Sequence, residues 1–278
     1  MSAAAVSVCI PAYQAGRYLA ATIRSVLAQT FDDFELLVLD NASTDATPEI
    51  LRRFADPRLR VLRNDRVLPL AENWNRVVAE SSGGLVKLVC ADDLLHPDCV
   101  RRQYAVLASD PGVALVCSRR DMINECGEVI APNRGLRGLV GRHRAGAVIR
   151  KIVRHGGNPL GEPGGALFRR GQFDAAGGFD ARWRFPMDLA LWIGLLGQGD
   201  FVGLRESLAA FRIGRGSLSA RAQRAEYAEQ RALSEGLASD PGWDVRPVDR
   251  LLGAAMAPGA RLRRHALYLV AKRQGERG

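Results

Sequence analysis

Short apolar runs alternate with helix-like segments over the first 118 residues, and this alternation leaves the chain few folds to adopt. Five runs have the length and aliphatic character of buried strands: 5–11, 34–40, 58–64, 85–90 and 113–118. Four segments between them carry apolar residues at helical spacing or begin at a proline: 16–30, 41–55, 70–81 and 97–109. Such alternation predicts an α/β fold, with a mostly parallel sheet covered by helices on both faces.

Polar side chains stand where these strands end. Tyr13 follows the first run, Asp40 ends the second, and Asp92 and Asp93 follow the fourth. Because ligands bind beyond the carboxyl ends of parallel strands, we expect these residues to meet in one crevice. Two adjacent carboxylates repel each other unless a positive group lies beside them. Their hard oxygen atoms suit Mg²⁺ or Mn²⁺, which predicts a divalent metal holding a diphosphate.

The crevice lacks two common nucleotide-binding motifs. The segment "PAYQAG" stands where a dinucleotide fold would carry Gly-x-Gly-x-x-Gly, and the chain has no Gly-x-x-x-x-Gly-Lys-Ser/Thr loop. Both a common dehydrogenase fold and a P-loop enzyme are therefore disfavoured.

The composition is ordinary for a globular protein, with 47% hydrophobic and 25% charged residues. No run reaches about eighteen apolar residues, so no membrane span is predicted, and the N-terminus does not read as a secretory signal. Five cysteines without zinc-site spacing are interpreted as reduced residues, with Cys9, Cys90 and Cys117 in the core. We therefore expect a cytoplasmic protein.

Arginine gives the chain a net charge of +9, and it is concentrated in residues 133–155 and 261–278. These stretches suit a polyanionic partner or, as the simpler interpretation, a solvated surface. The first interpretation allows peripheral contact with the inner face of a membrane. No aromatic-interleaved basic motif is present, so nucleic acid is not predicted as a partner.

Two stretches together resemble the family 2 glycosyltransferases: "VSVCIPAYQAGRYLAATIRSVLAQTFDDFELLVLDNASTDAT" and, further on, "GGLVKLVCADDLLHPD". The resemblance covers roughly residues 5–219 and implies a GT-A fold that inverts the anomeric centre. It implies a glycosyltransferase domain over 1–219, with a nucleotide-sugar-binding half (1–118) and an acceptor half (119–219). Residues 220–278 are expected to form a helical C-terminal extension.

The resemblance also implies roles for residues at the strand ends. Asp92 corresponds to the residue near the donor ribose and Asp93 to the metal ligand, while Cys90 replaces the family's first carboxylate. The other implied donor contacts are Pro11, Ala12 and Tyr13 against the base, Asp40 bonding the base, Asn73 and Asn75 on the 70–81 helix, and Lys87 beside a phosphate or the base. Taken singly, Asp40 reads as a turn residue, His96 as a loop residue and Trp74 as core. Thr47 reads as a helix N-cap.

In the second half, the resemblance places the catalytic base at Asp188, which opens the apolar helix "DLALWIGLL", and an acceptor contact at Glu162. Asp188 alone would read as a helix cap. Gly214 stands where the family often has a histidine, which leaves Arg212 or Arg215 as candidates for the diphosphate.

These features predict metal-assisted, inverting transfer of a sugar from a UDP- or dTDP-linked donor to a hydroxyl acceptor. The acceptor is a glycan, a lipid-linked sugar or a small natural product, and the cofactor is Mn²⁺ or Mg²⁺. Two alternatives stay open: a nucleotidyltransferase that forms nucleotide sugars, and a catalytically silent nucleotide-sugar-binding module. The sequence leaves open whether the chain forms a homodimer.

Overall fold

The structure is a computed structural model that describes residues 4–214, 224–259 and 262. The strands are β1 (Val6–Ala12), β2 (Phe34–Asp40), β3 (Leu59–Arg63), β4 (Leu85–Leu88), β5 (Leu94–Leu95), β6 (Val113–Ile123), β7 (Val129–Arg134), β8 (Gly141–His143), β9 (Ala166–Arg169) and β10 (Asp200–Arg212). The helices are α1 (Leu19–Leu27), α2 (Thr47–Arg52), α3 (Leu70–Ala79), α4 (Cys99–Ser109), α5 (Ala145–His155), α6 (Arg170–Ala175), α7 (Met187–Leu196) and α8 (Arg224–Ser239). The short 3₁₀ turns η1 (Pro163–Gly165) and η2 (Pro241–Trp243) complete the order, and residues 247–259 are also helical.

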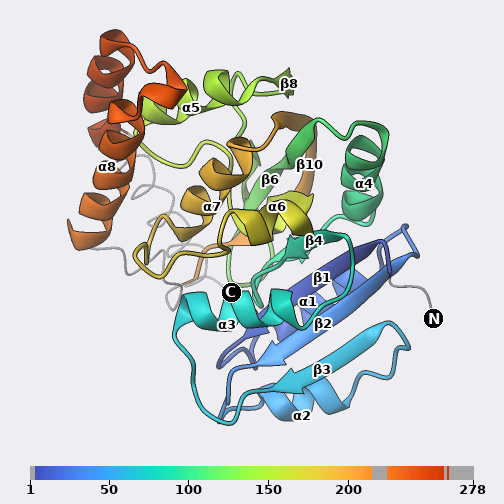
Figure 1. The fold of residues 1–278 in the computed structure, drawn as a ribbon. Coiled ribbons are helices and arrows are strands. Elements are labelled where there is room, and N and C mark those ends of the chain that lie inside the picture. The colour runs from blue at the N-terminus through green and yellow to red at the C-terminus, as the bar shows by residue number, and fades with distance from the viewer. Residues whose placement is uncertain (1–3, 215–223, 260–261, 263–278) are drawn as a thin grey trace.

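One sheet runs through the molecule in the order β3-β2-β1-β4-β9-β6-β10-β5, with β7 and β8 paired at its side (Figure 1). β1 pairs in parallel with β2 and β4, and β2 pairs in parallel with β3. β9 then inserts antiparallel between β4 and β6, and β6 runs parallel to β10. The predicted α/β fold, with a sheet flanked by helices, is confirmed. The sheet is mixed: four strand pairings are parallel, three of them among β1–β4, and five are antiparallel.

Both faces of the sheet are buried, which explains the near-continuous apolar strands. On β1, Val8 and Ile10 face the layer of α1, α2 and α4, while Cys9 faces the layer of α3, α5, α6 and α7. All three side chains are fully buried. A strand covered on both sides cannot alternate apolar and polar residues, because each face needs apolar side chains.

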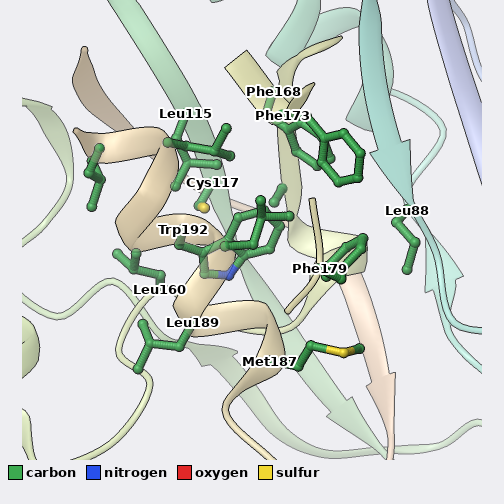
Figure 2. Packing of buried hydrophobic residues seen from close by; sticks show 14 of the residues in the cluster. Leu88, Leu115, Cys117, Leu160, Phe168, Phe173, Phe179, Met187, Leu189 and Trp192 are labelled. Atoms are coloured by element: carbon green, nitrogen blue, oxygen red, sulfur yellow. The ribbon is translucent and has the colours of Figure 1, made fainter. Parts of the chain in front are cut away.

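Aromatic rings fill the core under α7 (Figure 2). Phe168 of β9 lies 5.7 Å from Trp192 of α7 and 5.7 Å from Phe173 of α6, between ring centroids. Trp74 meets Phe179 edge-on at 5.0 Å, so the predicted packing role of Trp74 is confirmed. Rings of this size bury large apolar areas, so this cluster fixes α7 against the sheet.

The N-terminus of α2 differs by one residue from the prediction. Ala46 is the N-cap, and Thr47 is already the first helical residue. The Thr47 hydroxyl instead accepts from the backbone N–H of Ala15 (2.8 Å), and Asp45 accepts from the Thr47 N–H (3.0 Å). A tertiary bond between the loops after β1 and β2 thus replaces a local cap.

The expected C-terminal extension is helical where the structure describes it, and α8 lies beside α5 (Figure 1). Leu233, Leu237 and Ala238 of α8 are buried in the same cluster as the α7 side chains. The extension therefore shares the core of residues 119–219. Across the described segments, no helix has both the length and the apolar character needed to span a membrane.

Candidate active site

The loops after β1 and β2 form the first edge of the site. Ala12 and Asp40 are partners in the sheet register, and Asn41 donates its N–H to the Ala12 carbonyl at 2.8 Å. Pro11 and Ala12 are buried, whereas the Tyr13 side chain is 52% exposed. The ring of Tyr13 is thus available to a flat ligand at the strand ends.

Asp40 is buried and bonded within the protein. Its Oδ1 accepts from the Ser43 N–H at 2.9 Å, and its Oδ2 forms an ion pair with Arg63 of β3. A cavity of about 280 Å³ adjoins this pair and is bounded on the other side by Leu51 and Arg52 of α2. The exposed member of this pair is Arg63, while the Asp40 carboxylate lies buried behind it.

The two asparagines of α3 have different surroundings. Asn73 accepts from Asn64 at 2.9 Å, and Asn64 donates to Asn41 at 2.6 Å, so this network ties the ends of β2 and β3 to α3. Asn75 lies away from that edge. Its amide accepts from the Phe179 N–H (2.7 Å) and donates to the Phe179 carbonyl (2.9 Å).

The two aspartates after β4 lie beside Arg212, at the end of β10. The Arg212 N–H donates to Asp93 Oδ1 at 3.0 Å, and its Nε donates to the Asp92 carbonyl at 2.8 Å. Burial raises the pKa of Asp92, and burial together with the charge of Asp92 holds the pKa of Asp93 well above its usual range. The positive charge of Arg212 opposes both shifts.

Arg212 is itself held on several sides. Its Nη1 donates to the Asn124 carbonyl at 2.9 Å, and its guanidinium stacks over the Tyr18 ring at 4.4 Å. Arg212 therefore supports the acidic pair through its backbone and side chain. The alternative diphosphate candidate, Arg215, lies outside the described residues.

Lys87 was expected to contact a phosphate or the base, but the structure buries it completely. Its ammonium donates to Gln103 Oε1 at 2.9 Å and to the Ala166 carbonyl at 3.1 Å. Gln103 in turn donates to the Gly165 carbonyl at 2.6 Å. Lys87 and Gln103 thus support the η1 turn from beneath, and burial lowers the pKa of Lys87.

That turn carries Glu162 into the site. Glu162 precedes η1 and forms an ion pair with Arg120 of β6. Gly164, in the same turn, faces Asp93: a Cβ built on it would lie 3.8 Å from Asp93 Oδ2. The turn therefore brings the acceptor-half carboxylate close to the predicted metal ligand.

Asp188 occupies the first turn of α7, whose N-cap is Pro186. Its Oδ2 accepts from the Asn158 amide at 3.0 Å, and its Oδ1 accepts from the Leu189 N–H at 2.7 Å. It therefore does not take the N-cap position. It thus lies at the positive end of the α7 dipole.

The four carboxylates converge near Cys90, which is partly exposed instead of lying in the core. Although the residue is partly exposed, burial of its thiol raises the thiol pKa well above the usual value. The negative charges of Asp93, Asp92, Asp188 and Glu162, in that order, raise this pKa further. Asp92 and Asp93 after β4, Glu162 before η1 and Asp188 of α7, up to 98 positions from Cys90 in sequence, thus all influence the same thiol.

The residues present fit a divalent cation held mainly by a ligand's own oxygen atoms. Within the described residues, no group of three His, Cys, Asp or Glu side chains is arranged to hold a metal. Asp93 nevertheless offers Oδ2, to which no described residue donates a hydrogen bond. A cation here would offset the repulsion between Asp92 and Asp93 that raises the Asp93 pKa.

Beside these carboxylates lies a cavity of about 850 Å³, lined by Glu162 and Asp188 among others. Sequence reasoning missed two residues of this region, Arg120 and Asn158. Arg120 sits in "CSRRD", where charge continues a buried strand, and that contrast could have marked it. Asn158 gave no comparable signal, because its partner Asp188 is 30 residues away.

Comparison with known proteins gives a consistent result. The sequence profile described as Glycosyl transferase family 2 matches residues 7–176. The chain is 31% identical over 203 residues to the uncharacterized protein MT1568 of Mycobacterium tuberculosis, covering 69% of this chain and 61% of that protein.

A second relative is WfgD of Escherichia coli, a UDP-Glc:alpha-D-GlcNAc-diphosphoundecaprenol beta-1,3-glucosyltransferase. It is 28% identical over 132 residues, covering 46% of this chain and 52% of that protein. The chain thus spans between half and two thirds of the length of these two relatives.

Among solved structures, the fold resembles the mannosyltransferase PcManGT of Pyrobaculum calidifontis in complex with GDP-Man and Mn²⁺. The TM-score is 0.66 at 19% identity, and the likeness covers 98% of this chain and 74% of the other. At this identity the likeness concerns the fold, which is that of the GT-A glycosyltransferases.

Proposed function

Because the chain belongs to glycosyl transferase family 2, we propose that it transfers a sugar, with inversion, from a nucleoside-diphosphate sugar to an acceptor hydroxyl. The observation that carries this proposal is that Asp92, Asp93, Glu162 and Asp188 all influence the Cys90 thiol, with the turn after Glu162 against Asp93: a Cβ on Gly164 would lie 3.8 Å from Asp93 Oδ2. Glu162 and Asp188 line the large cavity of the second half, and Asp92 and Asp93 follow β4 at the strand ends of residues 1–118.

The donor is proposed to lie across the carboxyl ends of β1, β2 and β4. The exposed ring of Tyr13 suits a contact with the base. Asp40 is proposed to accept from a base N–H, although it is buried and its two oxygens already accept from Ser43 and Arg63. Asp92 is proposed to contact the ribose. Asn73 reaches the same edge through its bond to Asn64, whereas both amide groups of Asn75 are already engaged by Phe179.

Asp93 would hold the metal together with the donor diphosphate. A divalent cation there would neutralise the charge that builds on the departing nucleoside diphosphate. Asp93 keeps its position through the Arg212 N–H, so the carboxylate is fixed before the donor arrives.

Asp188 is proposed as the general base. As the acceptor oxygen attacks the anomeric carbon, the bond from that carbon to the diphosphate oxygen breaks, and the diphosphate leaves with the electron pair. The hydroxyl proton passes to the Asp188 carboxylate. Asn158 holds the Asp188 side chain at Oδ2, and Glu162, fixed by Arg120, lines the acceptor side.

A thermal-shift screen of nucleotide sugars with and without Mn²⁺ tests the donor part. We expect stabilisation by UDP- or dTDP-linked sugars that depends on Mn²⁺ or Mg²⁺. GDP-linked sugars serve as the comparison. A protein that none of these donors stabilises, at any metal concentration, would not be the transferase proposed here.

A cytoplasmic location and peripheral contact with the inner face of the membrane form part of the proposal. The basic stretches 133–155 and 261–278 support it. Co-sedimentation with anionic liposomes at low and moderate salt tests the contact, since electrostatic binding weakens with salt.

A further inference from the structure

The large cavity beside Asp188 has a strongly basic wall. Six cationic side chains line it, against the two carboxylates of Glu162 and Asp188: Arg119, Arg120, Arg134, Arg137, Lys151 and Arg154. They belong to β6, to the end of β7 with the following loop, and to α5. The arginine-rich stretch 133–155 thus supplies four of these cations.

Most of these cations have no carboxylate partner. Arg120 pairs with Glu162 and Arg154 with Asp249. Among the described residues, no ion pair engages Arg119, Arg134, Arg137 or Lys151. The Arg119 Nε atom is moreover buried without a hydrogen-bond partner. Buried donors left unsatisfied cost free energy, so this wall is better suited to an anion than to water alone.

Glycines bring the backbone close to this wall. Gly135 and Gly138 adopt φ of +88° and +70°, which side chains rarely tolerate. A Cβ on Gly138 would lie 2.9 Å from Lys151 Nζ, and one on Gly135 would collide with Arg120 Nη1. The 135–138 loop therefore packs closely against Lys151 and Arg120.

The cavity lining also includes apolar side chains. These are Phe185, Phe211 and Tyr227, and also Leu252 and Met256 of the C-terminal helix. The lining residues lie between Arg119 and Met256 in sequence, so the cavity belongs to the acceptor half and the extension. Its lining includes neither Asp93, the proposed metal ligand, nor Tyr13, the proposed contact for the nucleotide base.

We infer that the acceptor carries a phosphate or diphosphate, which Arg134, Arg137 and Lys151 bind while its reacting hydroxyl meets Asp188. This inference rests on the proposed function and specifies its acceptor class. Guanidinium groups bind phosphate through paired charge-assisted hydrogen bonds, which explains the use of arginine on this wall. The anion takes no part in the transfer and positions the acceptor.

Binding measured without nucleotide separates this inference from the proposed function. Inorganic pyrophosphate and farnesyl diphosphate are titrated in EDTA, so that metal-dependent binding near Asp93 does not contribute. The double variant Arg134→Glu/Arg137→Glu should bind both probes about 10- to 100-fold more weakly than the unmodified chain. The control Arg24→Glu/Arg205→Glu, which changes the net charge equally at exposed sites outside the cavity, should bind normally.

Two results would overturn the inference: no binding of either probe by the unmodified chain, or equal binding by the two double variants. The probes also distinguish two sources of the phosphate. Tighter binding of farnesyl diphosphate than of pyrophosphate indicates a lipid-linked acceptor whose lipid contacts the apolar residues of the lining. Equal binding of the two probes indicates a soluble phosphorylated acceptor.

The donor assay supplies the remaining control. The Arg134→Glu/Arg137→Glu variant should keep the Mn²⁺-dependent thermal shift with a nucleotide sugar and show a raised KM for acceptor. If that donor shift is lost along with pyrophosphate binding, the cations serve the donor, and the inference is wrong while the proposed transferase stands.

Discussion

Asp93 and Asp188 are both carboxylates of the proposed site, but their surroundings suit them to different tasks. Asp93 is 2% exposed and lies beside Asp92, so its charge is costly unless a cation offsets it. Asp188 lies at the positive end of α7 and accepts from Asn158. The first arrangement favours metal binding, and the second favours a base that is fixed in position.

Asp188→Asn should lower turnover by about 10²–10⁴-fold, the usual contribution of a positioned base. Asparagine keeps an oxygen for Asn158 but cannot accept the proton. The melting temperature and the donor-induced thermal shift should change little, because Asp188 is not the N-cap of α7. Sugar transfer at the unmodified rate would mean that another residue is the base, and Glu162→Gln would then be measured.

Asp93→Ala should abolish the stabilisation that Mn²⁺ adds to UDP or dTDP binding, because it removes the proposed protein ligand of the metal. Asp92→Ala is the matched comparison: it should weaken nucleotide binding and keep more of the metal response. Thermal shifts with and without Mn²⁺ measure both. An Asp93→Ala variant that responds to Mn²⁺ like the unmodified chain contradicts the assignment.

Lys87 provides a pH-dependent test. Because burial lowers its pKa, the unfolded chain binds one more proton than the folded chain between that lowered value and the ordinary value of about 10.4. The free energy of unfolding therefore rises with pH in this window, relative to a chain without the lysine. Between about pH 7 and about pH 10, the free energy of unfolding measured with urea should rise for the unmodified chain relative to Lys87→Met. Parallel profiles would contradict a lowered pKa.

The position of Asp92 and Asp93 after an apolar strand marked them as site candidates, whereas Asp188 was proposed as the base because of the family resemblance. The sequence could not reveal their partners. Arg212 lies 119 residues from Asp93, and nothing local indicates that its N–H would meet that carboxylate. The predicted ligand contact of Lys87 differs from the structure for a related reason. Its ammonium group donates to Gln103 and to the Ala166 carbonyl, and these partners are distant in sequence.

At the scale of elements, local signals predicted type and position well. β2 was expected at 34–40 and occupies Phe34–Asp40. The antiparallel insertion of β9 was beyond reach, because its four residues pair with β4 and β6 by long-range register. That insertion carries the η1 turn, and hence Glu162, to the end of β4. β9 therefore helps to complete the site, although its local sequence does not specify which strands it pairs with.

The α3 helix shows how an element joins the two halves. Asn75→Ala removes both bonds to the Phe179 backbone and leaves those groups unpaired, so it should cost about 1–3 kcal/mol in the free energy of unfolding. Glu72→Ala, exposed on the same helix, is the control and should stay within about 0.5 kcal/mol. Urea unfolding measures both. If Asn75→Ala instead weakens nucleotide binding at unchanged stability, Asn75 is a donor contact.

At the scale of the whole molecule, the C-terminal extension reaches the site region. Glu229 of α8 accepts from the backbone N–H groups of Arg184 and Phe185, each at 2.9 Å, just before the helix of Asp188. The sequence marked residues 220–278 as a separate helical extension because their pattern differs from the strand–helix alternation. Helical periodicity alone does not show which core a helix joins, and here α8 packs into the core of the acceptor half.

This packing predicts that α8 stabilises the whole domain. Leu237 is 6% exposed in the cluster that contains the α7 side chains, so Leu237→Ala should cost about 2–5 kcal/mol through lost burial and a cavity. Leu251, 71% exposed, offers the same substitution without burial, and Leu251→Ala should cost no more than about 0.5 kcal/mol. Urea unfolding followed by tryptophan fluorescence reports on the core through Trp192. Equal stability of the two variants would mean that the extension contributes little, and that residues 1–219 hold their core without it.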